Sequence, residues 1–241
     1  MPVHVITLDR TPERRAEFSR RNAHLQRVVR FGAVDGQQLD RAALRRAGLL
    51  QGDPPYTPGA IGACLSHATL WRKAVASGEV LTIAEDDAVF ARNFDAASAR
   101  LLAALPADWD FVLWGWNFDA YLWVELIPGV APAVLTMDQN LTRQHIDAFP
   151  NQLVVPQPVK LLHFFGTPCH SVTPRGAQRM LDFCLPIRPA MIAFEGFGVV
   201  VENRSQDMML NGIMPKLNGF VSIPPLVLTE NQREKSTIWP R

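Results

Sequence analysis

Short apolar segments alternate with helical segments along the first half of the chain, and this alternation restricts the possible folds more than any other feature. The strand-like segments are apolar and mostly β-branched, and they are residues 3–8, 28–31, 80–84 and 110–114. The helix-like segments are residues 12–28, 39–50, 60–76 and 93–105. Strand, helix and strand in this order predict βαβ units, and hence an α/β fold with a parallel sheet flanked by helices.

The pattern weakens after Trp116. Residues 117–160 carry five prolines, and residues 121–127 are the only firm strand prediction in them. So long an irregular stretch inside a compact domain is often a binding loop or lid. Regular elements then return. They are strands at residues 161–165 and 171–173, a helix at residues 174–185, a last helix from about residue 205 and an extended tail from residue 223.

Composition excludes several classes of protein. With 48% hydrophobic and 20% charged residues, the chain is neither disordered nor a disulfide-dense mini-domain. No apolar run approaches the ~20 residues that span a bilayer. The N-terminus lacks the basic segment of a signal peptide, so we expect a cytoplasmic protein. The three cysteines lack metal-ligand spacing, and we expect them to be reduced and mostly buried.

The positive charge is concentrated near the N-terminus. The net charge is +1, but residues 1–50 contain ten arginines and five acids and so carry +5. This excess is typical of a segment that meets an anion such as a phosphate, a lipid headgroup or nucleic acid, although on charge alone a solvated helix face is the more common explanation. The near-neutral total and the absence of a recognisable motif argue against a nucleic-acid binder.

Three consecutive carboxylates, Glu85, Asp86 and Asp87, follow the apolar segment 80–84 directly. Ligands of open α/β sheets bind at the carboxyl ends of strands, and hard oxygen ligands there suit Mg²⁺ or Mn²⁺ holding a diphosphate. In an extended backbone Glu85 and Asp87 point to one side and Asp86 to the other. The alternative is a solvated strand end with a helix cap.

Small residues dominate the start of the helix predicted after residue 59. Gly59, Ala60, Gly62 and Ala63 would let a ligand, or simply another backbone, approach the helix closely. His67 is either a ligand contact or a hydrogen-bonded structural histidine. Near the last helix, Asp207 and Glu202 are either caps or candidate general bases.

Taken in order, these motifs resemble glycosyltransferase family 25, which includes bacterial lipooligosaccharide sugar transferases and collagen galactosyltransferases. Any one motif is weak, but their order and spacing agree from residue 3 to about 115 and again from about 166 to 210. The matching stretches are VITLDR at residues 5–10, ERR at 13–15, AVDG at 33–36, TPGAIGACLSH at 57–67, IAEDDA at 83–88, DWDF at 108–111, and residues 166–171 and 175–177.

The resemblance implies a GT-A-type, Rossmann-like mixed sheet flanked by helices, a UDP-hexose donor, Mn²⁺ or Mg²⁺, and inversion at the anomeric carbon. It implies metal binding by Glu85 and Asp87, and a catalytic base at Asp207, with Glu195 and Glu202 as further candidates. The residues implied in donor binding are Leu8, Asp9, Arg10, Arg14, Ala33, Asp35, Gly36, Gly62, Ser66, His67 and Asp86.

The sequence therefore predicts one glycosyltransferase domain over residues 1–241, with residues 1–116 binding the nucleotide sugar and residues 117–241 facing the acceptor. We expect a saccharide or glycolipid acceptor, as in lipopolysaccharide biosynthesis, and peripheral contact with an anionic membrane. One rival is a family member that binds sugar nucleotides or a partner protein without transfer. A second rival, an unrelated phosphoryl- or nucleotidyl-transferring enzyme, is disfavoured because the chain has no phosphate-binding glycine loop.

Overall fold

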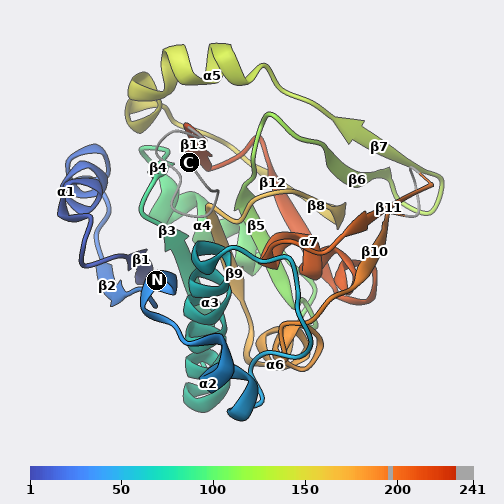
Figure 1. Cartoon of the computed structure of the whole chain (residues 1–241). Helices are drawn as coiled ribbons and strands as arrows, with labels where there is room; N and C mark the ends of the chain where they lie inside the picture. Colours follow the sequence, from blue (N-terminus) through green and yellow to red (C-terminus); the bar gives the residue numbers. More distant parts are fainter. Residues whose placement is uncertain (195–197, 232–241) are drawn as a thin grey trace.

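A nine-stranded mixed sheet forms the centre of the protein (Figure 1). The computed structural model describes residues 1–194 and 198–231. The strands of this sheet, in spatial order, are β2 (Val28–Gly32), β1 (Val3–Thr7), β3 (Leu81–Glu85), β9 (Cys169–Val172), β5 (Phe111–Gly115), β12 (Gly219–Ile223), β8 (Gln157–His163), β6 (Leu122–Ile127) and β7 (Ala131–Leu135).

Helices and two small sheets surround the central sheet. The helices are α1 (Pro12–Arg21), α2 (Arg41–Arg46), α3 (Pro58–Ser77), α4 (Phe94–Ala103), α5 (Gln139–His145), α6 (Pro174–Cys184) and α7 (Gln206–Asn211), with short 3-10 helices at Gly36–Gln38, Ile146–Asn151 and Met214–Lys216. The small sheets pair β4 (Ala88–Phe90) with β13 (Val227–Thr229), and β10 (Met191–Phe194) with β11 (Val199–Glu202).

The direction of the strands confirms the predicted fold class. Strands β2, β1 and β3 are parallel to one another, as expected from the strand and helix alternation. Strand β9 lies antiparallel between β3 and β5, so the sheet is mixed, and β8, β6 and β7 continue it in antiparallel pairs. The result is the Rossmann-like mixed sheet, flanked by helices, that the sequence predicts.

The core lies on both faces of the sheet, and β5 shows why. Phe111 and Leu113 belong to one apolar cluster, which also contains Trp71 of α3 and Met180 of α6. Val112 and Trp114 belong to a second cluster, which contains residues of α1 and α4. Because successive side chains of a strand point to opposite faces, a central strand with helices on both sides is apolar at every position.

Helix α1 ends seven residues earlier than predicted, at Arg21 instead of about residue 28. The reason is Asn22, which is 3% exposed. Its side-chain amide donates to the carbonyl oxygens of Phe18 and Ala88, and its Oδ1 accepts from the backbone N–H of Phe90. These bonds tie the end of the helix to β4, a partner that local sequence does not reveal.

The segment 117–160 is more regular than predicted. Besides β6, it contains the edge strand β7, helix α5 and the start of β8. The predicted strand at residues 161–165 begins earlier, at Gln157. The extended tail from residue 223 contains β13, which pairs with β4, and its residues 232–241 lie outside the described part of the chain. The three cysteines are buried and free, as expected.

Candidate functional site

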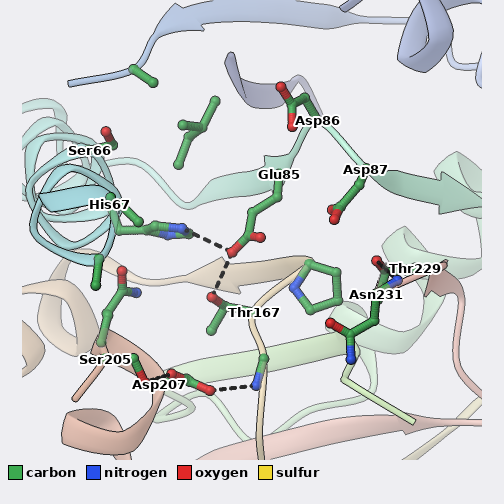
Figure 2. A pocket seen from close by; sticks show the side chains of 18 of the residues that line it. Ser66, His67, Glu85, Asp86, Asp87, Thr167, Ser205, Asp207, Thr229 and Asn231 are labelled. Carbon is green, nitrogen blue, oxygen red and sulfur yellow. Dashed lines mark hydrogen bonds and ion pairs between the residues drawn. The ribbon is translucent and has the colours of Figure 1, made fainter. Parts of the chain in front are cut away.

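A cavity of about 350 Å³ opens at the carboxyl ends of β1, β2 and β3. Its walls come from segments that are far apart in the sequence, including the N-terminal half of α3 and the start of α7. Figure 2 shows the acidic triplet on one side of this cavity and Asp207 on the other. The lining residues lie within the segments 6–14, 33–36, 59–67, 85–87, 117–120, 165–168, 205–208 and 229–231, although not every residue of a segment reaches the cavity.

The acidic triplet ends β3 and forms the turn that leads into β4, in place of the extended backbone expected for it. Figure 2 shows Glu85 and Asp87 pointing to the same side of the backbone, while Asp86 points to the opposite side. Glu85 Oε1 accepts a hydrogen bond of 3.0 Å from Thr167 Oγ1 and lies 3.5 Å from Nε2 of His67. Asp86 is bound by the guanidinium of Arg14, whose Nε donates to Oδ1 over 2.8 Å.

Asp87 lies in an environment that disfavours its negative charge. Burial, and then the neighbouring charge of Glu85, raises the pKa of Asp87 to about 7, and Arg14 opposes this rise. Its Oδ1 is buried and has no hydrogen-bond partner within the described residues. A buried acceptor without a donor is costly unless a cation or a ligand satisfies it.

These side chains fit a divalent cation of the kind that binds diphosphates. Glu85 and Asp87 supply hard carboxylate oxygens to one side, and Asp87 Oδ1 has a vacant acceptor position. Within residues 1–194 and 198–231, no three His, Cys, Asp or Glu side chains surround a common point closely enough to hold a metal alone. In Mg²⁺ sites one or two carboxylates commonly bind the ion, and phosphate oxygens and water complete its shell.

The small residues of α3 bring its first turns against the loop that follows β2. A Cβ atom on Gly62 would lie 2.5 Å from the carbonyl oxygen of Val34, and one on Gly36 would overlap the carbonyl oxygen of Pro58. Ser66 Oγ accepts from the Val34 backbone N–H over 2.9 Å and donates to the Gly62 carbonyl over 2.7 Å. Gly62 therefore shapes the cavity wall from behind without lining it.

His67 is a packed residue as well as a lining one. It is 2% exposed, and its ring stacks on the ring of His170 at a centroid distance of 5.3 Å. Trp71 Nε1 donates to His170 Nε2 over 3.2 Å, which fixes that nitrogen as an acceptor. Burial, and then the proximity of His67, lowers the pKa of His170 well below its ordinary value. The neutral His170 ring thus supports the ring of His67, which lies against Glu85.

Asp207 lies across the cavity from the triplet (Figure 2). Its Oδ2 accepts from the Gly166 backbone N–H over 2.8 Å, and its Oδ1 accepts from the Ser205 hydroxyl. Glu202 lies outside the cavity and pairs with Arg204 on the surface. Glu195 falls outside the described residues.

The cavity gathers most of the residues that the sequence implicated. Asp9 and Gly62 do not line it, and Asp9 instead points to solvent and pairs with Arg30. The implicated residues that do line it are Leu8, Arg10, Arg14, Ala33, Asp35, Gly36, Ser66, His67, Glu85, Asp86, Asp87 and Asp207.

Sequence reasoning missed the wall formed by Asn117, Asp119 and residues 229–231. Asn231 donates to Asp119 Oδ1 over 2.7 Å, and Arg143 of α5 donates to the carbonyl oxygens of Glu230 and Asn231. These contacts join segments more than eighty residues apart, and no motif in the sequence signals them. The part of the chain that the structure describes contains no helix both long and apolar enough to cross a membrane.

Comparison with known proteins gives the family. The profile of glycosyltransferase family 25 (LPS biosynthesis protein) matches residues 1–194. The chain is 35% identical over 149 residues to a human protein named inactive glycosyltransferase 25 family member 3; the match covers 54% of this chain and 25% of the relative. It is 38% identical over 125 residues to a glycosyltransferase 25 family member of Aedes aegypti, covering 47% of this chain and 21% of the relative.

The chain thus spans a quarter or less of the length of these relatives. The family profile nevertheless includes the loops after β1 and β2, helix α3 and the acidic triplet, which together make up most of the cavity wall. The chain belongs to glycosyltransferase family 25.

Proposed function

We propose that the protein is a metal-dependent, inverting glycosyltransferase that moves a hexose from a UDP-sugar to a saccharide or glycolipid acceptor. The observation that carries this proposal is the pair of carboxylates Glu85 and Asp87, which point to one side of a cavity large enough for part of a nucleotide sugar. Family membership supports the reaction class. The description of the family as LPS biosynthesis proteins supports a glycolipid or polysaccharide acceptor. With such an acceptor, we expect the enzyme to act at the cytoplasmic face of a membrane.

Each wall of the cavity has a separate part in the proposed reaction. Glu85 and Asp87 would hold the divalent cation, which offsets the charge that develops on the diphosphate leaving group. Arg10 and Arg14 line the cavity and provide cationic contacts for phosphate oxygens. The small residues at the start of α3 leave room for the nucleotide, while Thr167 and His67 fix the carboxylate of Glu85.

Asp207 is our candidate for the general base. Inversion needs a carboxylate on the face of the sugar opposite the leaving group, where it accepts the proton of the attacking hydroxyl. Asp207 lies on the cavity wall that faces the triplet, and its hydrogen bonds to Gly166 and Ser205 keep its carboxylate in place. The missed wall at Asn117 and Asp119 lines the same cavity and is our candidate for acceptor contacts.

The donor site is tested by calorimetric titration of a panel of nucleotide sugars with and without Mn²⁺. We expect Mn²⁺-dependent binding of a UDP-sugar, weakened at least about tenfold in Asp87→Asn, because the variant loses a charged ligand without losing volume. Asp182→Asn is the matched control, since Asp182 is exposed on α6 and does not line the cavity. Folded protein that binds no donor would overturn the proposal.

A second candidate function is donor binding without transfer. It is favoured by the name of the human relative, which describes that protein as inactive. Turnover separates the two candidates: a transferase releases UDP faster when a suitable acceptor is present, whereas a binding protein shows donor affinity and no acceptor-dependent release of UDP. An acceptor screen with the donor identified above makes this measurement.

A further inference from the structure

A turn at residues 117–120 forms part of the cavity wall and is joined to the residue that holds the proposed base. The Asn117 N–H donates to the Phe165 carbonyl oxygen over 2.7 Å. Gly166 lies directly against the amide of Asn117, because a Cβ atom on this glycine would be 2.2 Å from Asn117 Oδ1. Since the N–H of Gly166 binds Asp207, the turn and Asp207 belong to one continuous wall.

Asn231 holds the other end of this turn. Its Nδ2 donates to Asp119 Oδ1 over 2.7 Å. Its φ of +45° lies in the left-handed region, which is uncommon for a residue other than glycine, and Arg143 fixes it there by donating to its carbonyl oxygen over 2.8 Å. Within the described residues, Asn231 is the only hydrogen-bond partner of Asp119, so Asp119 Oδ2 is available to a ligand in the cavity.

Phe165 adds an apolar surface to the same wall. It lines the cavity and is half-buried, and its ring stacks on the ring of Phe194 at a centroid distance of 5.3 Å and an interplanar angle of 11°. An aromatic ring packs against the C–H groups of a sugar, and carboxylate and amide oxygens accept from its hydroxyls. The wall therefore offers both kinds of contact that a sugar ring can use.

The charged groups that this wall presents to the cavity are negative. Asp119 and Asp207 both line it, whereas the only arginine or lysine side chains among the described lining residues are Arg10 and Arg14. These two are bonded to carboxylates on the proposed donor side, over 3.0 and 2.8 Å. Arg143 does not line the cavity and donates to backbone carbonyls. A carboxylate or phosphate on a sugar bound at this wall would therefore be repelled.

We propose that this wall is an acceptor subsite for a sugar unit without carboxylate or phosphate groups, and that Asp119 sets its selectivity against acidic sugars. This inference rests on the proposed function and extends it to the charge of the acceptor. A neutral sugar donates its hydroxyls to Asp119 and Asn231 and presents the reacting hydroxyl to Asp207. Asp119 is exposed, so water and salt screen part of the repulsion and the discrimination is several-fold.

The test compares two sugars that differ in charge and hardly in size. Methyl glycosides of the common hexoses are first screened for acceptor-dependent release of UDP from UDP-glucose and UDP-galactose. The uronate of an active glycoside and its uncharged uronamide are then measured as competitive inhibitors, so that the result does not depend on which hydroxyl reacts. In the wild type we expect the inhibition constant of the uronate to be at least about fivefold the higher. This ratio should shrink when salt is raised from about 0.05 M to about 0.5 M.

Asp119→Asn removes the charge and keeps the size of the side chain. We expect the inhibition constant of the uronate to fall at least about threefold and that of the uronamide not to fall, because only the uronate is repelled. A damaged wall would instead weaken both inhibitors. Asp182→Asn is the matched control, since it removes the same charge from an exposed position on α6 outside the cavity, and it should leave the ratio unchanged.

Equal inhibition by uronate and uronamide in the wild type, including no inhibition by either, would overturn the inference. A ratio that Asp119→Asn leaves unchanged would also overturn it. In both cases acceptor-dependent release of UDP by the wild type would still support the proposed function. If no glycoside in the screen raises UDP release by the folded wild type, the proposed transfer fails and the inference fails with it.

Discussion

At the scale of single residues, the two carboxylates that face each other across the cavity have different surroundings. Asp87 has a buried oxygen without a hydrogen-bond partner in the described residues, and its pKa is raised by burial and by Glu85. Asp207 has both oxygens occupied by donors from Gly166 and Ser205. The unpaired oxygen of Asp87 is therefore suited to binding a cation, whereas the hydrogen bonds of Asp207 hold its carboxylate in one orientation.

The role of Asp207 gives a prediction that separates chemistry from binding. In Asp207→Asn we expect the dissociation constants of donor and Mn²⁺ to stay within about threefold of the wild type, because the amide oxygen still accepts from Gly166. Turnover should fall by at least about 100-fold, the lower end of the usual contribution of a general base. Turnover is measured as acceptor-dependent UDP release. Unchanged turnover would show that Asp207 is not the general base and only anchors α7.

At the scale of secondary structure elements, the sequence predicted those features that depend on local pattern. The parallel strands followed from strand and helix order. The opposite orientations of Asp86 and Asp87 were expected from an extended backbone, but these two residues form the turn between β3 and β4. Features set by distant partners were missed. Asn22 ends α1 through bonds to β4, and residues 229–231 enter the cavity wall through contacts with Asp119 and α5.

The contact between α3 and the loop after β2 is tested by adding one methyl group. In Gly62→Ala the new Cβ would meet the Val34 carbonyl and the Gly36 backbone, neither of which is a flexible side chain. We expect a loss of about 1–3 kcal/mol in the free energy of unfolding, measured in urea, and weaker donor binding. Gly32→Ala is the control, since no atom lies within 4 Å of its new Cβ.

At the scale of the whole molecule, the two ends of the central strands have different functions. The cavity lies where β5 continues into Asn117, while the other end of β5 begins at the fully buried Asp110. Asp110 Oδ1 accepts from Arg175 over 2.8 Å, and Oδ2 accepts from Arg179 over 2.8 Å and from the Asn218 backbone N–H over 2.9 Å. One carboxylate thus ties α6 and the start of β12 to the middle of the sheet.

Asp110→Asn should therefore destabilise the fold without changing the site. An amide in place of the carboxylate loses the ionic bonds to Arg175 and Arg179 and turns an N–H₂ group toward other donors. We therefore expect a loss of about 2–4 kcal/mol in the free energy of unfolding. Asp108→Asn, in the same loop but exposed, should change the free energy of unfolding by less than about 0.5 kcal/mol.

At urea concentrations below the unfolding transition, the donor affinity of Asp110→Asn should equal that of the wild type, because Asp110 lies at the opposite end of the strand from the cavity. A loss of donor affinity in the folded variant would mean that the two ends of the sheet are mechanically coupled.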